Sequence, residues 1–224
     1  MNKELEMNPN KLVAFLGKPC KEFTKAAFEL SEKFDTPVFL RLTTRVSHSQ
    51  SLVELCDREN DELKAYEKNP AKYVMMPGNA IKRHVDVENR MRALAEYAET
   101  SPLNTVEDNG AEIGIITSGI TYAYAKEALG TQANFLKLGM AYPMPVKLIK
   151  DFAAKCKKVY VLEELDPFIE EHCRVNGVDV IGKVAFTLLG EYSVNLIKKV
   201  VLGAEIEDVK PEPIPVRPPV MCAG

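Results

Sequence analysis

Arg45 and His48 directly follow a short apolar stretch, Val38–Leu42, whose composition predicts a β-strand. In parallel sheets, functional groups gather at the carboxyl ends of the strands. The guanidinium of Arg45 could there bind a carboxylate or a phosphate through two hydrogen bonds. From the chemistry alone, pairing of both side chains with surface carboxylates is the simpler explanation.

A group of carboxylates, Glu163, Glu164 and Asp166, follows another apolar stretch. Paired carboxylates can serve general acid–base chemistry when burial raises one pKa, and they can also bind a hard cation. Asp166 precedes Pro167, however, and Asp before Pro is typical of a helix N-terminus, where the carboxylate accepts backbone N–H bonds. We favour this N-cap interpretation for Asp166. It leaves Glu163 and Glu164 available for a contact between domains.

Two further patterns are weaker signals. Residues 117–119, Thr-Ser-Gly, form a turn between a predicted strand and helix that could hold a phosphate on backbone N–H groups. The turn lacks both common phosphate-binding glycine patterns, so close packing explains it as well. Residues 82–84, Lys-Arg-His, could contact an anion, but basic groups near a helix start are common on solvated faces. These patterns do not assemble a complete active site.

Composition restricts the possible functions. The chain has 224 residues, a net charge of −3 and no basic block, which argues against nucleic-acid binding. No apolar run has the length of a membrane span, and the polar N-terminus has no signal-peptide core. The five cysteines are scattered, with no Cys-x-x-Cys pair. We therefore expect reduced thiols in a cytoplasmic protein without a membrane association, and no zinc site.

The pattern of apolar residues predicts an α/β fold, with an open parallel sheet covered by helices on both faces. From residue 111 onward, short buried strands alternate with amphipathic helices. The predicted strands of this part are the apolar run at 113–116 and the segments 134–138, 157–162 and 178–181. A helix is predicted after the turn at 117–119, up to Gly130, and further helices at 146–155, 168–176 and 193–202. Upstream we expect helices at 20–34 and 80–100, the strand at 38–42 and a polar linker at 104–110. Residues 209–219 are proline-rich and predict an extended segment.

Several motifs occur together in an order that resembles a known enzyme family. They are TPVFLRLTTRVSHSQ (36–50), NPAKYVMMPGNAIKRH (69–84), GIITSGITYAYAKEAL (114–129), LKLGMAYPMP (136–145), VYVLEELDPFIEE (159–171) and RPPVMCAG (217–224). Together they resemble the large (α) subunits of indolepyruvate:ferredoxin oxidoreductases, which are thiamine-diphosphate-dependent 2-oxoacid:ferredoxin oxidoreductases. The resemblance covers residues 20–224.

The resemblance implies a division of the chain and a position inside a longer subunit. Residues 1–50 would be the C-terminal piece of a pyrimidine-binding domain, and 51–110 a helical connector. Residues 111–205 would form a middle domain similar to the transketolase C-terminal domain, and 206–224 a linker to a diphosphate-binding domain. The cofactor-activating glutamate and the diphosphate-binding motif of the family have no counterpart in the sequence.

The resemblance also implies the chemistry. The family oxidatively decarboxylates aryl 2-oxoacids such as indolepyruvate to acyl-coenzyme A and CO2, and passes the electrons to ferredoxin. It uses thiamine diphosphate, magnesium and 4Fe–4S clusters, together with a small β subunit. We expect this chain alone to bind none of these cofactors, to be inactive and to have a structural role.

Two residues, Arg45 and Cys222, match family positions. Arg45, with His48, would contact the substrate carboxylate or a domain junction. Cys222 would be the first half of a Cys-x-x-Cys metal-binding pair that the sequence does not complete. Two alternatives remain from the residues: the middle domain of another thiamine-diphosphate enzyme, of the transketolase or pyruvate dehydrogenase type, or a stand-alone module that binds an anion with Arg45 and Lys82-Arg83.

Overall fold

A four-stranded sheet forms the centre of the structure, which is a computed structural model. It describes residues 9–48, 50, 52–53, 55–57 and 65–206, without the side chains of residues 9–19 and Arg45. The strand order is β1-β3-β2-β4. The strands are β1 (Asn104–Glu107), β2 (Ile113–Thr117), β3 (Asn134–Leu138) and β4 (Lys158–Leu162).

The central strand β2 is parallel to both of its neighbours, as the buried apolar run predicts. Ile115 pairs with Phe135 of β3 on one side and with Tyr160 of β4 on the other. The edge strand β1 is antiparallel to β3. The predicted α/β class and open sheet are therefore confirmed, with one antiparallel edge added to the parallel strands.

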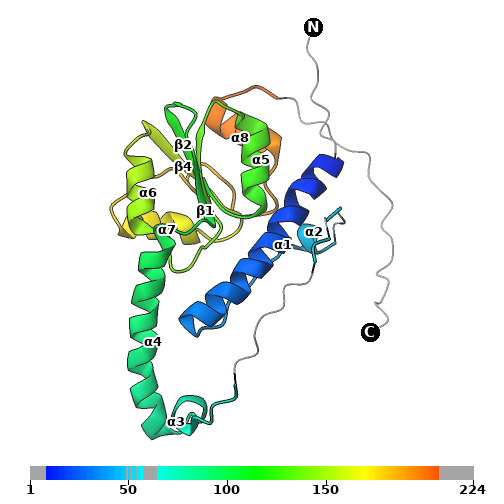
Figure 1. The fold of residues 1–224 in the computed structure, drawn as a ribbon. Coiled ribbons are helices and arrows are strands. Elements are labelled where there is room, and N and C mark those ends of the chain that lie inside the picture. The colour runs from blue at the N-terminus through cyan, green and yellow to red at the C-terminus, as the bar shows by residue number, and fades with distance from the viewer. Residues whose placement is uncertain (1–8, 49, 51, 54, 58–64, 207–224) are drawn as a thin grey trace.

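Two pairs of helices cover the two faces of the sheet (Figure 1). Helices α5 (Ile120–Leu129) and α8 (Val194–Leu202) pack on one face, and α6 (Val146–Ala153) and α7 (Phe168–Val175) pack on the other. Each face has its own apolar core. The first is built around Ile115, Leu129, Phe135, Leu162 and Ile197, and the second around Ile116, Leu136, Ile149, Val161 and Ile169.

The N-terminal half is an extended helical arrangement that joins this sheet unit at few points. Its helices are α1 (Pro9–Phe34), α2 (Thr44–Ser47), α3 (Pro70–Tyr73) and α4 (Pro77–Ala98). Only the end of α4 is buried, at Leu94 and Ala98, and the rest of this helix extends away from the sheet (Figure 1). The rings of Phe34 and Tyr97 meet edge to face, 5.4 Å apart, and join α1 to α4.

Three local predictions are wrong. Val38–Leu42 forms no strand, because an isolated strand is not stable and no described segment pairs with it. Val178–Ile181 makes a single bridge, between Ile181 and Tyr160, rather than a fourth parallel strand. The predicted linker at residues 104–110 contains β1, because pairing with β3 satisfies its backbone groups.

The helix predicted at 20–34 begins earlier, at Pro9, and continues through residues 17–19. The helices predicted at 80–100, 146–155, 168–176 and 193–202 are present, with ends that differ by up to three residues. No helix among the described residues is long and apolar enough to cross a membrane.

Gly139, at the exit of β3, is required by a close backbone contact. Its N–H donates to the carbonyl oxygen of Leu103 (3.1 Å), and an added Cβ would lie 2.2 Å from that oxygen. We therefore expect Gly139→Ala to lower the free energy of unfolding by about 1–3 kcal/mol, as for other overpacked sites. Urea denaturation measures this value.

The matched control is Gly78→Ala. Gly78 is helical, and an added Cβ would meet no atom within 4 Å. The control should be neutral or stabilising by about 0.5–1 kcal/mol. Equal losses in the two variants would contradict the role of the contact at Gly139.

Candidate functional site

The residues predicted from family positions do not come together in the described part of the chain. Arg45 belongs to the short helix α2, and its side chain is outside the described residues. His48 follows as the C-cap of α2, is exposed, and donates its backbone N–H to the carbonyl of Thr44 (3.0 Å). Cys222 lies outside the described residues. Their assignment to substrate, junction or metal stays a prediction.

The carboxylates at the end of β4 do form a site, and Glu163 is its centre. Glu163 is buried, and its two carboxylate oxygens accept hydrogen bonds from the backbone N–H groups of Ile169 (2.7 Å) and Glu170 (2.9 Å). Both donors lie in the first turn of α7, where N–H groups have no partner within the helix. Glu163 is thus the cap of α7.

The N-cap interpretation of Asp166 is therefore wrong. The residue before α7 is Pro167, and α7 receives no hydrogen bond from a local capping side chain. Asp166 is exposed, and Leu165 before it adopts a left-handed conformation (φ 62°) in the turn after β4. The end of β4 supplies the capping carboxylate three residues earlier than the sequence pattern indicates.

Two other carboxylates hold the irregular segment that joins α7 to α8. Glu170 accepts the backbone N–H of Lys183 (2.8 Å) and binds Arg174 (2.6 Å). Glu164 accepts the backbone N–H of Tyr192 (2.8 Å).

The prediction that Glu163 is available for a contact between domains is wrong, because Glu163 is buried and both its oxygens are used within the domain. For Glu164 the contact stays a prediction, since only one of its oxygens accepts the bond from Tyr192.

Lys183 completes this network and was not identified from the sequence. Its ammonium donates to the backbone carbonyl of Glu163 and to the hydroxyl of Tyr192 (2.9 Å). The ring of Tyr192 stacks on Phe186, which anchors the segment in the core. No local motif indicates these contacts, because Lys183 and Glu163 are 20 residues apart.

Burial governs the ionisation of this network. Burial raises the pKa of the Glu163 carboxyl, although the two backbone donors and Lys183 oppose the shift. Burial also lowers the pKa of Lys183, against the attraction of Glu163 and Glu170. For Tyr192 and Cys173, burial raises the pKa to about 12, so both stay protonated at neutral pH. Perturbed ionisable groups at the carboxyl edge of a sheet mark a candidate functional site.

At residues 117–119, hydroxyl contacts support the close-packed turn, which is one of the two explanations for this pattern. The hydroxyl of Thr117 is fully buried and donates to the carbonyl of Leu162 (2.8 Å). The hydroxyl of Thr121 lies 2.6 Å from it and donates to the carbonyl of Ser118 (2.7 Å). These bonds join β2, β4 and the start of α5.

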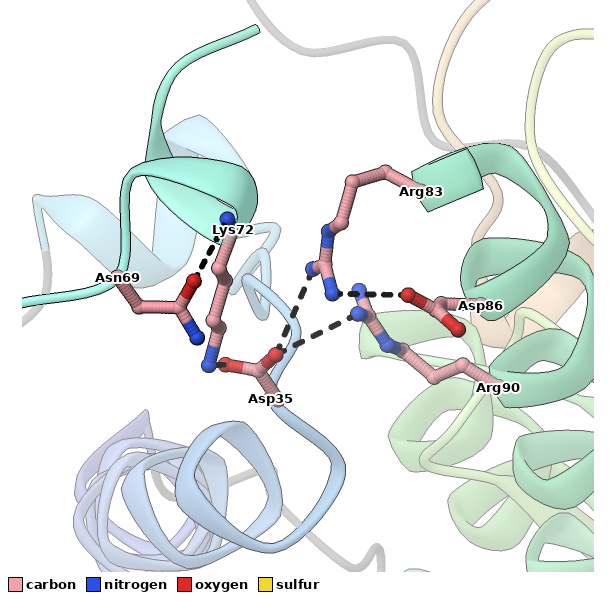
Figure 2. Close-up of polar contacts among 6 residues, drawn as sticks. All are labelled: Asp35, Asn69, Lys72, Arg83, Asp86 and Arg90. Carbon is pink, nitrogen blue, oxygen red and sulfur yellow. Dashed lines mark hydrogen bonds and ion pairs between the residues drawn. The ribbon is translucent and has the colours of Figure 1, made fainter. Parts of the chain in front are cut away.

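A second polar cluster lies between α1, α3 and α4 (Figure 2). Lys72 (2.8 Å), Arg83 (3.6 Å) and Arg90 (3.6 Å) surround the carboxylate of Asp35. Arg83 also binds Asp86 (3.1 Å). The hydrogen bond from Lys72 lowers the pKa of Asp35. Arg83, part of the predicted basic patch, is thus engaged by carboxylates of its own chain. The half-exposed cluster adds little stability but fixes α3 and α4 relative to α1.

No group of three His, Cys, Asp or Glu side chains within the described residues is arranged to hold a metal ion. The chemistry open to the Glu163 network is hydrogen bonding and positioning of α7 and of the segment that precedes α8.

The sequence of the chain is similar to those of archaeal enzymes. The indolepyruvate oxidoreductase subunit IorA of Methanothermobacter thermautotrophicus is 38% identical over 91% of this chain. Those of Archaeoglobus fulgidus and Thermococcus kodakarensis are each 34% identical, over 91% and 90% of the chain. The chain is homologous to a part of IorA. It spans about a third (36%) of the length of each of these relatives.

Comparisons with family models and with solved structures give less information about the family. No family model matches the chain. A solved 2-oxoglutarate:ferredoxin oxidoreductase from Magnetococcus marinus, which contains 2-oxoglutarate, coenzyme A and succinyl-CoA, is 24% identical to it with a TM-score of 0.47. That match covers 58% of this chain and 24% of the solved one. The resemblance to indolepyruvate oxidoreductase subunits is thus supported by the IorA sequences over nearly the whole chain.

The cap on α7 gives a direct test. We expect Glu163→Gln to lower the free energy of unfolding by about 1–3 kcal/mol, because the amide can accept only one of the two buried N–H bonds. Asp166→Asn is the matched control and should change it by less than about 0.5 kcal/mol. Urea denaturation at neutral pH measures both values. A larger loss in Asp166→Asn would restore the original N-cap assignment.

The raised pKa of Glu163 predicts a pH dependence. The folded state binds a proton at Glu163 at a higher pH than the unfolded chain does. As the pH falls through the folded-state pKa of Glu163, the free energy of unfolding of the wild-type chain therefore rises. The rise is complete below 4.5, the ordinary pKa of this carboxyl in the unfolded chain. Since Glu163→Gln cannot titrate, the stability difference between wild type and variant should grow as the pH is lowered. A constant or shrinking difference would contradict the shift.

Proposed function

We propose that this chain is part of the large subunit of an oxidoreductase that converts aryl 2-oxoacids, indolepyruvate among them, to acyl-coenzyme A and CO2. In this proposal ferredoxin accepts the electrons and a small β subunit completes the enzyme. The observation that carries the proposal is the 34–38% identity to archaeal IorA subunits over about nine-tenths of the chain.

We further propose that the sheet unit is the middle domain of this subunit. The sequence boundaries assign residues 111–205 to it, and β1 extends its sheet to Asn104. In this proposal residues 1–50 belong to a preceding pyrimidine-binding domain, 51–110 connect the two, and 206–224 lead to a diphosphate-binding domain. The small number of contacts between the helical half and the sheet unit is consistent with such a division.

The role of the sheet unit in this enzyme is positional. When bound elsewhere in the subunit, thiamine diphosphate, magnesium and 4Fe–4S clusters would supply the carbanion and electron-transfer chemistry. The residues of this chain hold the carboxyl edge of the sheet in one geometry through Glu163, Glu170 and Lys183. A fixed edge gives adjoining domains a surface of defined shape.

A middle domain of another thiamine-diphosphate enzyme remains the first alternative, since the sequence of this part also resembles the middle domains of transketolase and pyruvate dehydrogenase. A stand-alone anion-binding module is less favoured. Of its predicted residues Arg45, Lys82 and Arg83, Arg83 already binds Asp35 and Asp86, whereas the side chain of Arg45 lies outside the described residues.

The activity can be tested on the enzyme that contains this chain. Antibodies raised against the chain would isolate that enzyme from its source cells under anaerobic conditions. We expect the isolated enzyme to reduce a viologen dye only when coenzyme A is present. This reduction should be at least about tenfold faster with indolepyruvate or phenylpyruvate than with pyruvate or 2-oxoglutarate. Material isolated with pre-immune serum is the control.

Each other outcome decides a separate point. Preference for pyruvate or 2-oxoglutarate would keep the reaction and overturn the substrate class. If an intact preparation of the isolated enzyme reduced the dye with none of the 2-oxoacids, the proposed reaction would be overturned. That outcome would favour the transketolase-type alternative, and a glycolaldehyde-transfer assay on the same sample detects that activity.

A further inference from the structure

Three cations converge on one carboxylate at the junction of α1, α3 and α4 (Figure 2). Arg83 and Arg90 are seven residues apart on α4, which places them two turns apart on one face of the helix. Lys72 of α3 donates to one oxygen of Asp35 (2.8 Å), and a nitrogen of each guanidinium lies 3.6 Å from the other oxygen. Asp86 also pairs with Arg83 (3.1 Å). Three cations therefore face two carboxylates, and one positive charge of the cluster has no counterpart among the described residues.

The side chain of Arg90 makes no hydrogen bond within the part of the chain that the structure describes. Its one polar contact there is the ion pair with Asp35, at a distance longer than the roughly 2.7–3.2 Å of an N–H···O bond. The side chain is nevertheless only 15% exposed. Among the described residues, the one fully buried side-chain N or O atom without a partner is Nε2 of His172, so solvent reaches the guanidinium nitrogens of Arg90. These nitrogens carry N–H donors in a fixed geometry, to which an anion from solution can bind.

The cations of this cluster are better enclosed than the carboxylate that they surround. The side chains of Arg83 and Arg90 are 24% and 15% exposed, whereas that of Asp35 is 52% exposed. A half-exposed carboxylate loses little when it rotates into solvent, so Asp35 is the replaceable member of the cluster. The cations come from two helices and are mostly buried, so the fold sets their positions.

We propose that Lys72, Arg83 and Arg90 form a binding site for a phosphate group, which takes the place of the Asp35 carboxylate. A phosphate group presents at least three oxygens, so each cation can have an oxygen of its own, whereas Asp35 offers two oxygens to three cations. The planar guanidinium groups match pairs of phosphate oxygens, and Lys72 adds a point charge. Inorganic phosphate and the phosphate of a larger molecule share this chemistry.

This site is separate from the anion-binding module predicted from Arg45 and Lys82-Arg83. It uses Lys72, which the tertiary structure places beside α4, and Arg90 in place of Arg45 and Lys82. The inference does not depend on the proposed enzymatic activity.

Isothermal titration calorimetry of the 224-residue chain with inorganic phosphate tests the site, at a constant ionic strength that sodium chloride maintains. We expect saturable binding to one site per chain at concentrations up to about 10 mM. Arg90→Gln should weaken this binding at least about tenfold, because the site then lacks one charged donor group. Arg92→Gln is the matched control. It removes the same charge from an exposed residue of the same helix, which binds Asn89 (3.3 Å), and should change the affinity less than about twofold.

Asp35→Asn gives a prediction of the opposite sign. It removes the carboxylate that competes for the three cations, so the affinity for phosphate should rise at least about threefold. A variant that is merely less well folded cannot mimic this gain. Weaker phosphate binding by Asp35→Asn would overturn the exchange of carboxylate for phosphate.

The ligand class and its source are decided by other outcomes. Absence of saturable binding by the wild-type chain, or equal losses in Arg90→Gln and Arg92→Gln, would overturn the site. Acetate that binds as tightly as phosphate would overturn the ligand class. Adenosine monophosphate distinguishes the two sources. Tighter binding than that of inorganic phosphate would assign the site to the phosphate of a larger molecule, and equal or weaker binding would assign it to free phosphate.

Discussion

Two carboxylates that lie outside the helices cap the helices on one face of the sheet. Helices α6 and α7 both begin after a proline, which has no side-chain group to accept the free N–H groups of the first turn. Glu99 accepts the N–H groups of Lys147 (2.9 Å) and Leu148 (2.8 Å), and Glu163 does the same for α7. The apolar core beneath these helices depends on their orientation, so both caps fix the packing of that face.

Glu163 fixes the positions of several elements at once. Its side chain caps α7, while its backbone carbonyl binds the ammonium of Lys183. Burial disfavours the charged forms of both groups, as the directions of their pKa shifts indicate. Buried ionic groups are a weak source of stability, but they require one geometry to satisfy all their hydrogen bonds. The network therefore specifies the shape of the carboxyl edge more than it stabilises the fold.

The two halves of the chain differ in how far they bury their own apolar side chains. The sheet unit has an apolar core on each face and pairs its strands internally. The described residues between Val38 and Val87 include many exposed large apolar side chains, with Phe39 at 92% exposed. Contiguous exposed apolar surface is typical of an interaction site. The helical half thus has the composition of a connecting element, whichever partner covers it.

The sequence by itself determined the α/β class, the three parallel strands and most helices, because the spacing of apolar residues is a local property of the chain. It also located the carboxylates at the end of β4. It could not determine that Glu163 rather than Asp166 caps α7, because both carboxylates are close to α7 in sequence and the course of the intervening turn decides which one reaches the free N–H groups. It could not determine that Lys183 and Tyr192 join Glu163 and Glu164, because these partners are 20 and 28 residues apart. Only the tertiary structure decided the pairing of β1 and the lack of pairing at Val38–Leu42. A strand forms only where another strand offers its backbone groups, and hydrogen-bond partners are chosen by proximity in space.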